Sequence, residues 1–326
     1  MKKQIIMFFA AAIAATAAFA EPEVTDVVAR QRYPWNGLVD ITCSVTGING
    51  TTNGLDFAVA MVNRDSGDVR KASNFWIVQD GKNSTDKEVH TNGNYRLLWD
   101  AQADLGSGLY SNVVVRVTTV KGHLRVQLWE GGPYWATTNI GAEEPEDYGY
   151  YFWWGDTVGY KRENNAWVAS DGSSSNFSFG SSNTHNKSIA TLQSEGWITS
   201  DSILTPEHDA AHVHWGGNWR IPTKQELDDL SSNCDWNWTT MNGVNGYVVR
   251  GKGDYASNSI FLPCAGFGYG TSLLDAGSYG YYLSSVPTSD YYYGAWGLYF
   301  GSSGHYARYN SRSDGQSVRP VRGFTE

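Results

Sequence analysis

The chain has 326 residues, with 33 acidic residues against 24 Lys and Arg residues and a net charge of −9. It contains no run of Lys or Arg, and such a run is what holds a nucleic-acid backbone, so we expect no nucleic-acid partner. Beyond the N-terminus no apolar stretch approaches about 18 residues, so we expect no transmembrane segment.

Residues 1–20 have the three parts of a secretory signal peptide. Lys2 and Lys3 form a positive start, residues 5–18 are apolar, and Ala18-Phe19-Ala20 is a small-residue cleavage site. We therefore expect a mature protein that begins at Glu21 and is secreted or held at the bacterial cell surface.

Residues 21–120 have the pattern of short strands separated by Gly-, Asn- and Asp-rich turns. The expected strands are Val24–Gln31, Leu38–Val45, Leu55–Asn63, Asn94–Trp99 and Asn112–Val120. Strands at this spacing, with no helical periodicity, predict an all-β immunoglobulin-like sandwich domain. The Cys…Trp…Cys pattern of true immunoglobulin domains is missing, so only the architecture is implied.

Residues 121–326 differ in composition, because 11 of the 14 Trp residues lie beyond residue 121. Helix starts are expected at Thr205-Pro206-Glu207 and at Thr223, whose spacing to Glu226 predicts a capping box with Leu227 and Leu230 on the apolar face. After Asn233 the sequence returns to strands punctuated by Gly. This order predicts an α+β domain.

The chain has three cysteines, an awkward number for an exported protein. Cys234 and Cys264 could form a disulfide, which would leave Cys43 unpaired. The alternative is that all three are small buried hydrophobic residues.

Several motifs of the second half resemble the Fibrobacter succinogenes major paralogous domain, a family of exported bacterial proteins. The resemblance spans about residues 124–323, and its motifs agree in order and spacing. They are Trp135–Ala142, Pro145–Gly149, Trp154-Gly155-Asp156, Asp209–Val213, Trp215–Thr223, Phe261-Leu262-Pro263 and Ser317–Val321.

The resemblance implies a C-type-lectin-like fold for residues 121–326. That fold is shared with formylglycine-generating enzymes and with the variable proteins of diversity-generating retroelements. Trp219–Thr223 with Glu226 matches their common scaffold element. The enzyme activity is the least favoured function, because it needs a pair of reactive thiols and Cys264 has no second Cys near it in sequence.

The stretch from Tyr279 to Asp314 has the composition of a binding surface. Nine Tyr, seven Ser and five Gly make up 21 of its 36 residues. Tyr offers a large rigid contact area, while Ser and Gly offer adaptable polar contacts. In retroelement variable proteins the diversified positions lie in the matching place, here residues 284–314. Lys, Glu, Gln and Met are absent from Gly253 through Gly315, a range that begins well before residue 284, so the residue bias favours diversification only weakly.

We therefore expect an exported, non-catalytic recognition protein that needs no cofactor and binds a protein or glycan ligand at a cell or phage surface. Arg308 or Arg312 would meet acidic groups, while Trp296, Leu298 and Phe300 would face inward. The predicted contact residues are Ser289, Asp290, Tyr291, Tyr292, Tyr293, Ser302, Ser303, His305, Tyr306, Tyr309, Ser311 and Arg312.

The alternative function is a carbohydrate-binding adhesin that uses exposed Trp residues. The candidates are Trp153, Trp154, Trp236 and Trp238, each of which could equally pack in the core. His208 and His212 have the i, i+4 spacing of metal ligands, but the order of residues is not that of a zinc protease, so we expect no metal. On that helix we expect His208 and Asp209 to be exposed and Ala210 and Val213 to face the core.

Overall fold

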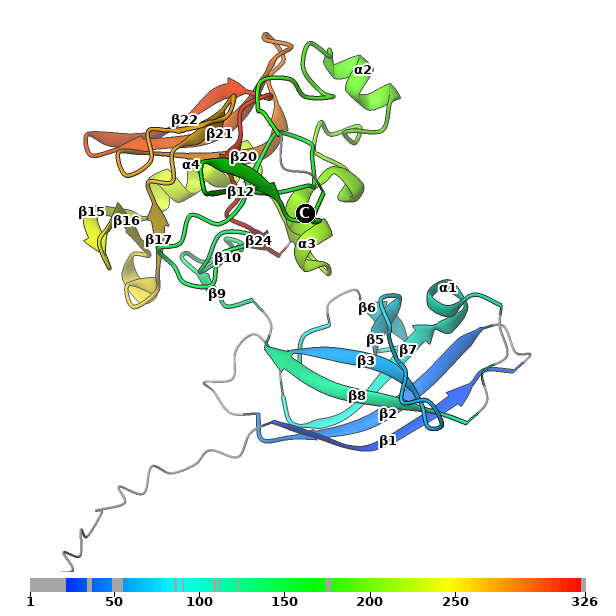
Figure 1. Cartoon of the computed structure of the whole chain (residues 1–326). Helices are drawn as coiled ribbons and strands as arrows, with labels where there is room; N and C mark the ends of the chain where they lie inside the picture. Colours follow the sequence, from blue (N-terminus) through cyan, green and yellow to red (C-terminus); the bar gives the residue numbers. More distant parts are fainter. Residues whose placement is uncertain are drawn as a thin grey trace, which may run out of the picture. The chain divides into compact units, whose positions relative to one another are not determined.

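The structure, a computed structural model, describes residues 22–33, 37–48, 55–84, 87–89, 91–107, 110, 112–121, 123–173 and 177–323. The predicted signal peptide, residues 1–20, lies outside the described residues. The chain divides into two compact units, of which the first runs to Val120 and the second starts at Lys121 and also takes in Glu88 (Figure 1). No helix in the described part of the chain is long and apolar enough to cross a membrane.

The first unit consists of strands and one short helix. Its elements are β1 (Glu23–Gln31), β2 (Leu38–Thr46), β3 (Leu55–Asn63), β4 (Val69–Lys71), β5 (Phe75–Gln79), β6 (Lys82–Ser84), β7 (Gly93–Asp100), α1 (Ala101–Leu105) and β8 (Val113–Lys121). They form a five-stranded sheet of order β1-β2-β7-β5-β6 and a three-stranded sheet of order β4-β3-β8. The five predicted strands are confirmed, whereas β4, β5 and β6 were not expected from the sequence.

The core of the first unit lies between these two sheets. Ile41 and Leu97 from the larger sheet and Phe57 and Val117 from the smaller one belong to a single cluster of buried side chains. Alternate residues of each strand point into it, as the two-residue period of a strand dictates.

The second unit contains many short strands. They are β9 (Arg125–Gln127), β10 (Tyr134–Ala136), β11 (Tyr151–Phe152), β12 (Tyr160–Glu163), β13 (Ala166–Ala169), β14 (Trp219–Arg220), β15 (Asp235–Met241), β16 (Val244–Arg250), β17 (Ser259–Pro263), β18 (Phe267–Tyr269), β19 (Ser272–Leu274), β20 (Tyr279–Pro287), β21 (Gly294–Gly301), β22 (Gly304–Ser311), β23 (Gln316–Ser317) and β24 (Val321–Arg322). The largest sheet has seven strands in the order β13-β12-β11-β23-β20-β21-β22. Three smaller sheets have the orders β14-β24-β10-β9, β15-β16-β17 and β18-β19.

The helices of this unit are short. They are α2 (Ile189–Ser194), the 3-10 helix η1 (Pro206–His208), α3 (Ala210–Trp215), α4 (Lys224–Asn233) and the 3-10 helix η2 (Gly253–Tyr255). The predicted capping box of α4 is confirmed: the Glu226 backbone N–H donates to the Thr223 hydroxyl over 3.2 Å, and the Thr223 backbone N–H donates to the Glu226 carboxylate over 2.8 Å. Arg220 adds two hydrogen bonds to that carboxylate, of 2.7 and 2.6 Å.

The helix start expected at Thr205 needs correction. Thr205 precedes only η1 and makes no side-chain capping bond. Asp209 caps α3 instead, because its carboxylate accepts hydrogen bonds from the backbone N–H groups of Ala211 and His212. Two expected exposures are also wrong. Asp209 is buried, and its burial raises its pKa to about 6. Val213, which was expected to face the core, is half exposed.

The α+β lectin-like fold expected for residues 121–326 is wrong. The protein is mostly β, with 46% strand and 12% helix, and most of its strand pairs are antiparallel. Helices do form near the predicted helix starts, as α3 and α4. They have only six and ten residues and form no layer of their own. The Gly-punctuated sequence after Asn233 folds into successive hairpins that make up most of the unit.

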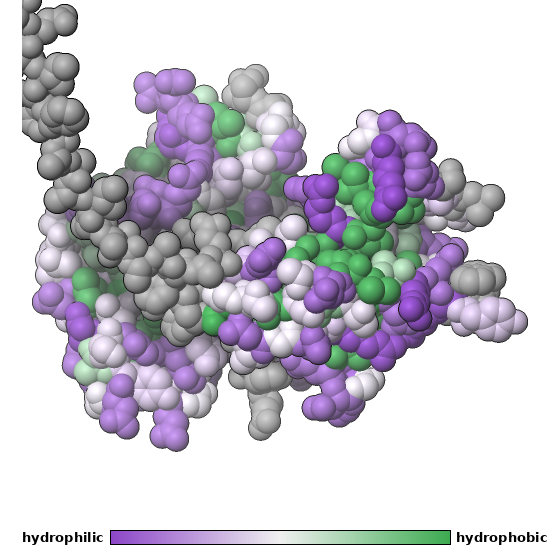
Figure 2. Space-filling view, turned by 90° about the horizontal axis from the view of Figure 1, so that it is seen from below, coloured by the Kyte–Doolittle hydropathy of each residue, from purple (hydrophilic) through white to green (hydrophobic). Residues whose placement is uncertain are grey.

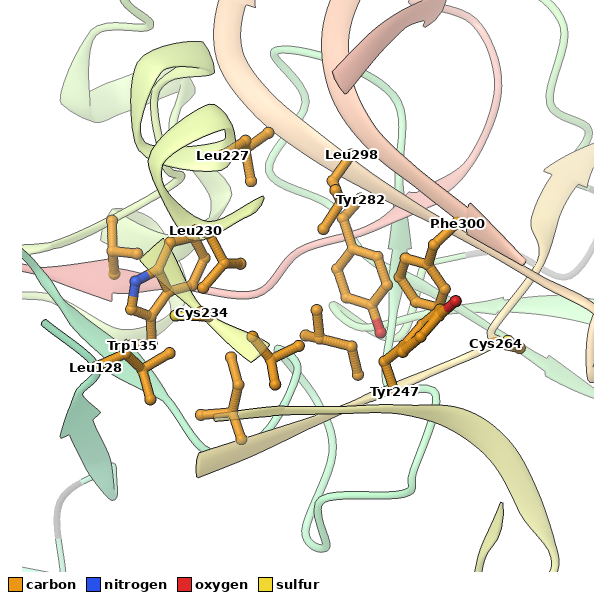
Figure 3. Packing of buried hydrophobic residues seen from close by; sticks show 14 residues of the cluster. Leu128, Trp135, Leu227, Leu230, Cys234, Tyr247, Cys264, Tyr282, Leu298 and Phe300 are labelled. Carbon is orange, nitrogen blue, oxygen red and sulfur yellow. The ribbon is translucent and has the colours of Figure 1, made fainter. Parts of the chain in front are cut away.

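One face of α4 supplies a main core of the second unit. Leu227 and Leu230 project from α4 toward Leu298 and Tyr282 of β21 and β20 (Figure 3). Cys234, which follows α4, belongs to the same buried cluster. This packing buries Leu298 and Phe300 on one side of the β20-β21-β22 sheet end.

Hydrophobic side chains also reach the molecular surface. In Figure 2 they form separate patches among hydrophilic residues rather than one continuous face. Many of the exposed large hydrophobic residues are tyrosines, and five of these lie between residues 291 and 309. Tyrosine is intermediate in hydropathy because of its hydroxyl group, so an exposed tyrosine carries both apolar area and a polar tip.

We predict that His123 makes the second unit sensitive to acid. Its ring stacks on Trp215 with 3.6 Å between ring centroids, and burial together with nearby Arg322 lowers its pKa from 6.5 to about 4. An unfolded histidine therefore binds its proton first as the pH falls, and the stability that this histidine contributes is lost between about pH 6.5 and pH 4.

The control is His123→Phe, which keeps an aromatic ring but cannot titrate. Between pH 7 and pH 5 the wild type should lose about 1–2 kcal/mol of unfolding free energy relative to the variant, after allowance for the exposed part of the ring. Urea unfolding followed by tryptophan fluorescence measures this difference. Parallel pH profiles for the two proteins would refute the assignment.

Candidate functional site

The Tyr-rich stretch forms one end of the seven-stranded sheet. β20, β21 and β22 are antiparallel neighbours, and β22 is the edge strand (Figure 1). Their register pairs Trp296 with Tyr309 and Tyr299 with Tyr306. Because neighbouring residues of a strand point to opposite faces, these two pairs lie on opposite sides of the sheet.

The inward face behaves largely as expected. Leu298 and Phe300 are buried, and Phe300 stacks on Tyr282 with 5.7 Å between ring centroids. Trp296 lies on the same face but is only partly buried, with the Lys224 ammonium 5.0 Å from its ring centre. The inward prediction holds for Leu298 and Phe300, and only in part for Trp296.

Four exposed tyrosines gather at the loop between β20 and β21, and we call them the tyrosine cluster. Tyr291, Tyr292, Tyr293 and Tyr309 are 41%, 55%, 43% and 41% exposed. Tyr291 stacks on Tyr309 at 4.7 Å and lies 5.7 Å from Tyr293, measured between ring centroids. Hydrogen bonding with Tyr309 raises the pKa of Tyr291, and the neighbouring Tyr293 and Asp290 act in the same direction.

The loop that carries the tyrosine cluster is closed by its own hydrogen bonds. The Thr288 hydroxyl donates to the carbonyl oxygens of Tyr291 at 2.7 Å and of Gly294 at 3.0 Å. The Gly294 backbone N–H donates to the Tyr291 carbonyl at 2.8 Å. A Cβ atom at Gly294 would lie 2.8 Å from the Thr288 hydroxyl oxygen, so a larger residue there would displace this hydroxyl from its hydrogen bonds. The exposed rings therefore stand on a constrained backbone.

Arg312 anchors this loop from inside and is not a contact residue. It is 0% exposed, and its guanidinium donates to the carbonyl oxygens of Gly294, Thr184 and Lys187 at 2.8, 3.0 and 2.9 Å. The guanidinium also lies over the Trp154 ring, 5.0 Å from its centre. The prediction that Arg312 touches the ligand is thus wrong, because the whole guanidinium is buried: Nε and Nη1 make these hydrogen bonds, and Nη2 is buried without a partner among the described residues.

The other predicted contact residues do not form one surface. Ser289 and Asp290 are exposed beside the tyrosine cluster, whereas Ser302 and Ser303 are exposed in the turn at the far end of β21. Ser311 is half buried near the cluster. His305 is half buried, because its ring stacks on Trp236 at 3.9 Å between centroids. Tyr309 lies five residues along β22 from Gly304, where the turn of Ser302 and Ser303 ends, which is about 17 Å along the strand.

Tyr306 belongs to a second group, on the opposite face of the sheet, which we call the tyrosine ladder. Tyr299 lies 5.3 Å from Tyr306, 5.2 Å from Tyr281 and 5.5 Å from Tyr279, measured between ring centroids. The Arg308 guanidinium lies 4.8 Å from the centre of the Tyr299 ring. Sequence reasoning missed Tyr279, Tyr281 and Tyr299. Their spacing of two along a strand could have indicated a shared face, but only the strand register aligns them.

In the described part of the chain, no tryptophan forms an open, flat surface on which a sugar could stack. None of the Trp residues described there is exposed, and Trp154 is 1% exposed. Trp236 and Trp238 each pack edge-on against Tyr247. The adhesin function would therefore need a site other than a flat Trp surface.

The cysteines are free thiols. Cys43, Cys234 and Cys264 are all buried and unpaired, so the possible Cys234–Cys264 bridge is absent. Burial raises the pKa of Cys264 to about 12, and a reactive thiol requires a lowered pKa.

Comparison with known proteins adds one finding. A family model described as a domain of unknown function (DUF8237) matches residues 221–321, from just before α4 to β24. The match includes the tyrosine cluster and the tyrosine ladder. Neither the curated proteins nor the solved structures gave a match to the chain.

We predict that Arg312 and Arg308 differ sharply in their effect on stability. Arg312→Ala should lower the unfolding free energy by about 3 kcal/mol, because it strips three buried carbonyls of a charged donor. Arg308→Ala should lower it by about 1 kcal/mol at most, the value of an exposed cation–π contact. Urea unfolding of both variants tests this contrast, and similar losses would contradict the anchoring role of Arg312.

Proposed function

We propose that this protein is an exported, non-catalytic recognition protein that binds a partner at a cell or phage surface through the tyrosine cluster. The observation that carries the proposal is the exposure of four tyrosines, stacked in part on one another, around a loop closed by Thr288 and Gly294. Rigid aromatic side chains bury large area at low entropic loss, which is why Tyr is frequent at binding surfaces.

The polar neighbours of the cluster support recognition of a protein rather than simple adhesion. Ser289 donates a hydrogen bond to Asp290 at 2.9 Å, and both are exposed beside the tyrosines. An aromatic centre with a polar rim is the usual composition of a protein–protein interface. In this proposal Tyr291 and Tyr292 are the anchors, and Ser289 and Asp290 select the partner.

Membership of the Fibrobacter succinogenes major paralogous domain family, and diversification of residues 284–314 by a retroelement, belong to the same proposal. Both rest on sequence motifs and composition. A reverse-transcriptase gene beside the coding sequence, with a template repeat matching the codons of 284–314, would establish diversification. Its absence from the genomic neighbourhood would rule that part out and leave the binding role untouched.

Site-specific photo-crosslinking tests the proposed surface. A photoreactive phenylalanine analogue replaces Tyr292 in one protein and Val168 in a matched control. Val168 is 40% exposed on β13, the opposite edge strand of the same sheet. After illumination on intact bacterial cells, a discrete crosslinked product should form from position 292 and not from position 168.

Equal crosslinking from the two positions, or none from position 292, would count against the tyrosine cluster as the binding surface. Circular dichroism on both labelled proteins checks that they keep the wild-type fold.

A further inference from the structure

A hollow whose lining contains none of the residues of the tyrosine cluster has the lining of a small-molecule site. It has a volume of about 200 Å³ and brings together residues 153–157, residues 182–184, Trp197 and residues 207–208. We call it the Trp153 cleft. Pockets for drug-sized ligands start at about 300 Å³, so the cleft suits a single small ring.

Aromatic rings form the walls of the cleft. Trp153 is partly buried and held edge-on against Phe177, with 5.4 Å between centroids. Trp197 stacks on His208 at 4.0 Å, and its indole N–H donates to Glu195 at 3.0 Å. These contacts hold the walls in place before any ligand arrives.

Asp156 gives the cleft a partly used carboxylate. One oxygen, Oδ1, accepts hydrogen bonds from the backbone N–H groups of Thr157 at 2.7 Å and Val158 at 3.1 Å. The other oxygen has no hydrogen-bond partner among the residues that the structure describes. Asp156 is partly buried, and this burial raises its pKa. A partly buried acceptor gains from a ligand that donates to it.

The remaining polar groups of the lining offer both donors and acceptors. Glu207 adds a second carboxylate, Asn183 an amide, and Ser182 a hydroxyl that lies 3.3 Å from the Thr184 hydroxyl. A ligand hydroxyl can donate to a carboxylate and accept from an amide or hydroxyl at the same time, whereas an ammonium group can only donate.

An aromatic cage for a cation does not fit this geometry. One face of Trp197 is taken by His208, and the Lys187 ammonium already lies 5.8 Å from the centre of the same ring. A second cation would be repelled by that ammonium. The mixed donors and acceptors of the lining instead match a polyhydroxylated ring, whose C–H groups would pack on the partly exposed Trp153 rather than on the covered face of Trp197.

We propose that the Trp153 cleft binds one neutral pyranose unit of a glycan, with Asp156 and Glu207 accepting hydrogen bonds from its hydroxyl groups. Arg312 supports the cleft, because it donates to the Thr184 carbonyl and lies over Trp154, and both residues line the cleft. The lining of the cleft contains no residue of the tyrosine cluster, so the sugar-binding proposal and the proposed partner-binding surface can be tested independently.

Titration calorimetry on the full chain tests the cleft with the methyl glycosides of glucose, galactose, mannose and N-acetylglucosamine. At least one should bind in the millimolar range, as expected for a ligand with few contacts. Asp156→Asn should weaken that binding about tenfold, because it removes a charged acceptor while its amide oxygen still accepts from Thr157 and Val158. Asp290→Asn, in the tyrosine loop, is the matched control and should leave sugar binding unchanged.

Three results would overturn the sugar site. They are no heat from any of the four glycosides at about 50 mM, well above the millimolar range, equal binding by wild type and Asp156→Asn, and binding of tetramethylammonium in place of the glycosides. Urea unfolding of Asp156→Asn checks that any loss of binding is not a loss of fold. Crosslinking from Tyr292 should persist in Asp156→Asn, which separates this site from the tyrosine cluster.

Discussion

The buried guanidinium of Arg312 is the interaction on which both candidate sites of the second unit depend. It joins the start of β21 to the segment 184–187 through three carbonyl oxygens, and it covers the Trp154 ring. Arg312 thus contacts both Gly294 of the loop that carries the tyrosine cluster and Thr184 of the Trp153 cleft. Burial lowers the pKa of Arg312 to about 10, so it remains charged at neutral pH. Three charge-assisted hydrogen bonds offset the desolvation of that charge.

A rigid base explains how exposed aromatic residues can serve recognition without destabilising the fold. Leu298 and Phe300 are held against α4 and β20, and the exposed tyrosines of the cluster lie at the edge strand and the β20–β21 loop, outside this buried packing. Tyr291 and Tyr309 stack on each other, which limits their motion before a partner binds. Pre-ordering of this kind reduces the entropy lost on binding.

Local signals in the sequence predicted local structure well. The capping box at Thr223 and Glu226 and the inward side chains of Leu227, Leu230, Leu298 and Phe300 depend on neighbours in sequence, and they are confirmed. The lectin-like α+β fold failed because short helices of six to ten residues cannot form a layer, and the hairpins dominate. Arg312 was misplaced because its partners, Thr184 and Lys187, are more than 120 residues away. The tyrosine ladder depends on strand register, which composition does not reveal.

The most direct test of the account is a binding measurement on a variant in which Tyr291, Tyr292 and Tyr309 are all replaced by Ser. Flow cytometry would compare the labelled variant with wild type on the cells that wild type binds. The account predicts a loss of binding of at least about a hundredfold, since each anchor tyrosine contributes on the order of 1–2 kcal/mol, with an unchanged melting temperature. Undiminished binding by a folded triple variant would contradict the claim that the tyrosine cluster is the recognition surface.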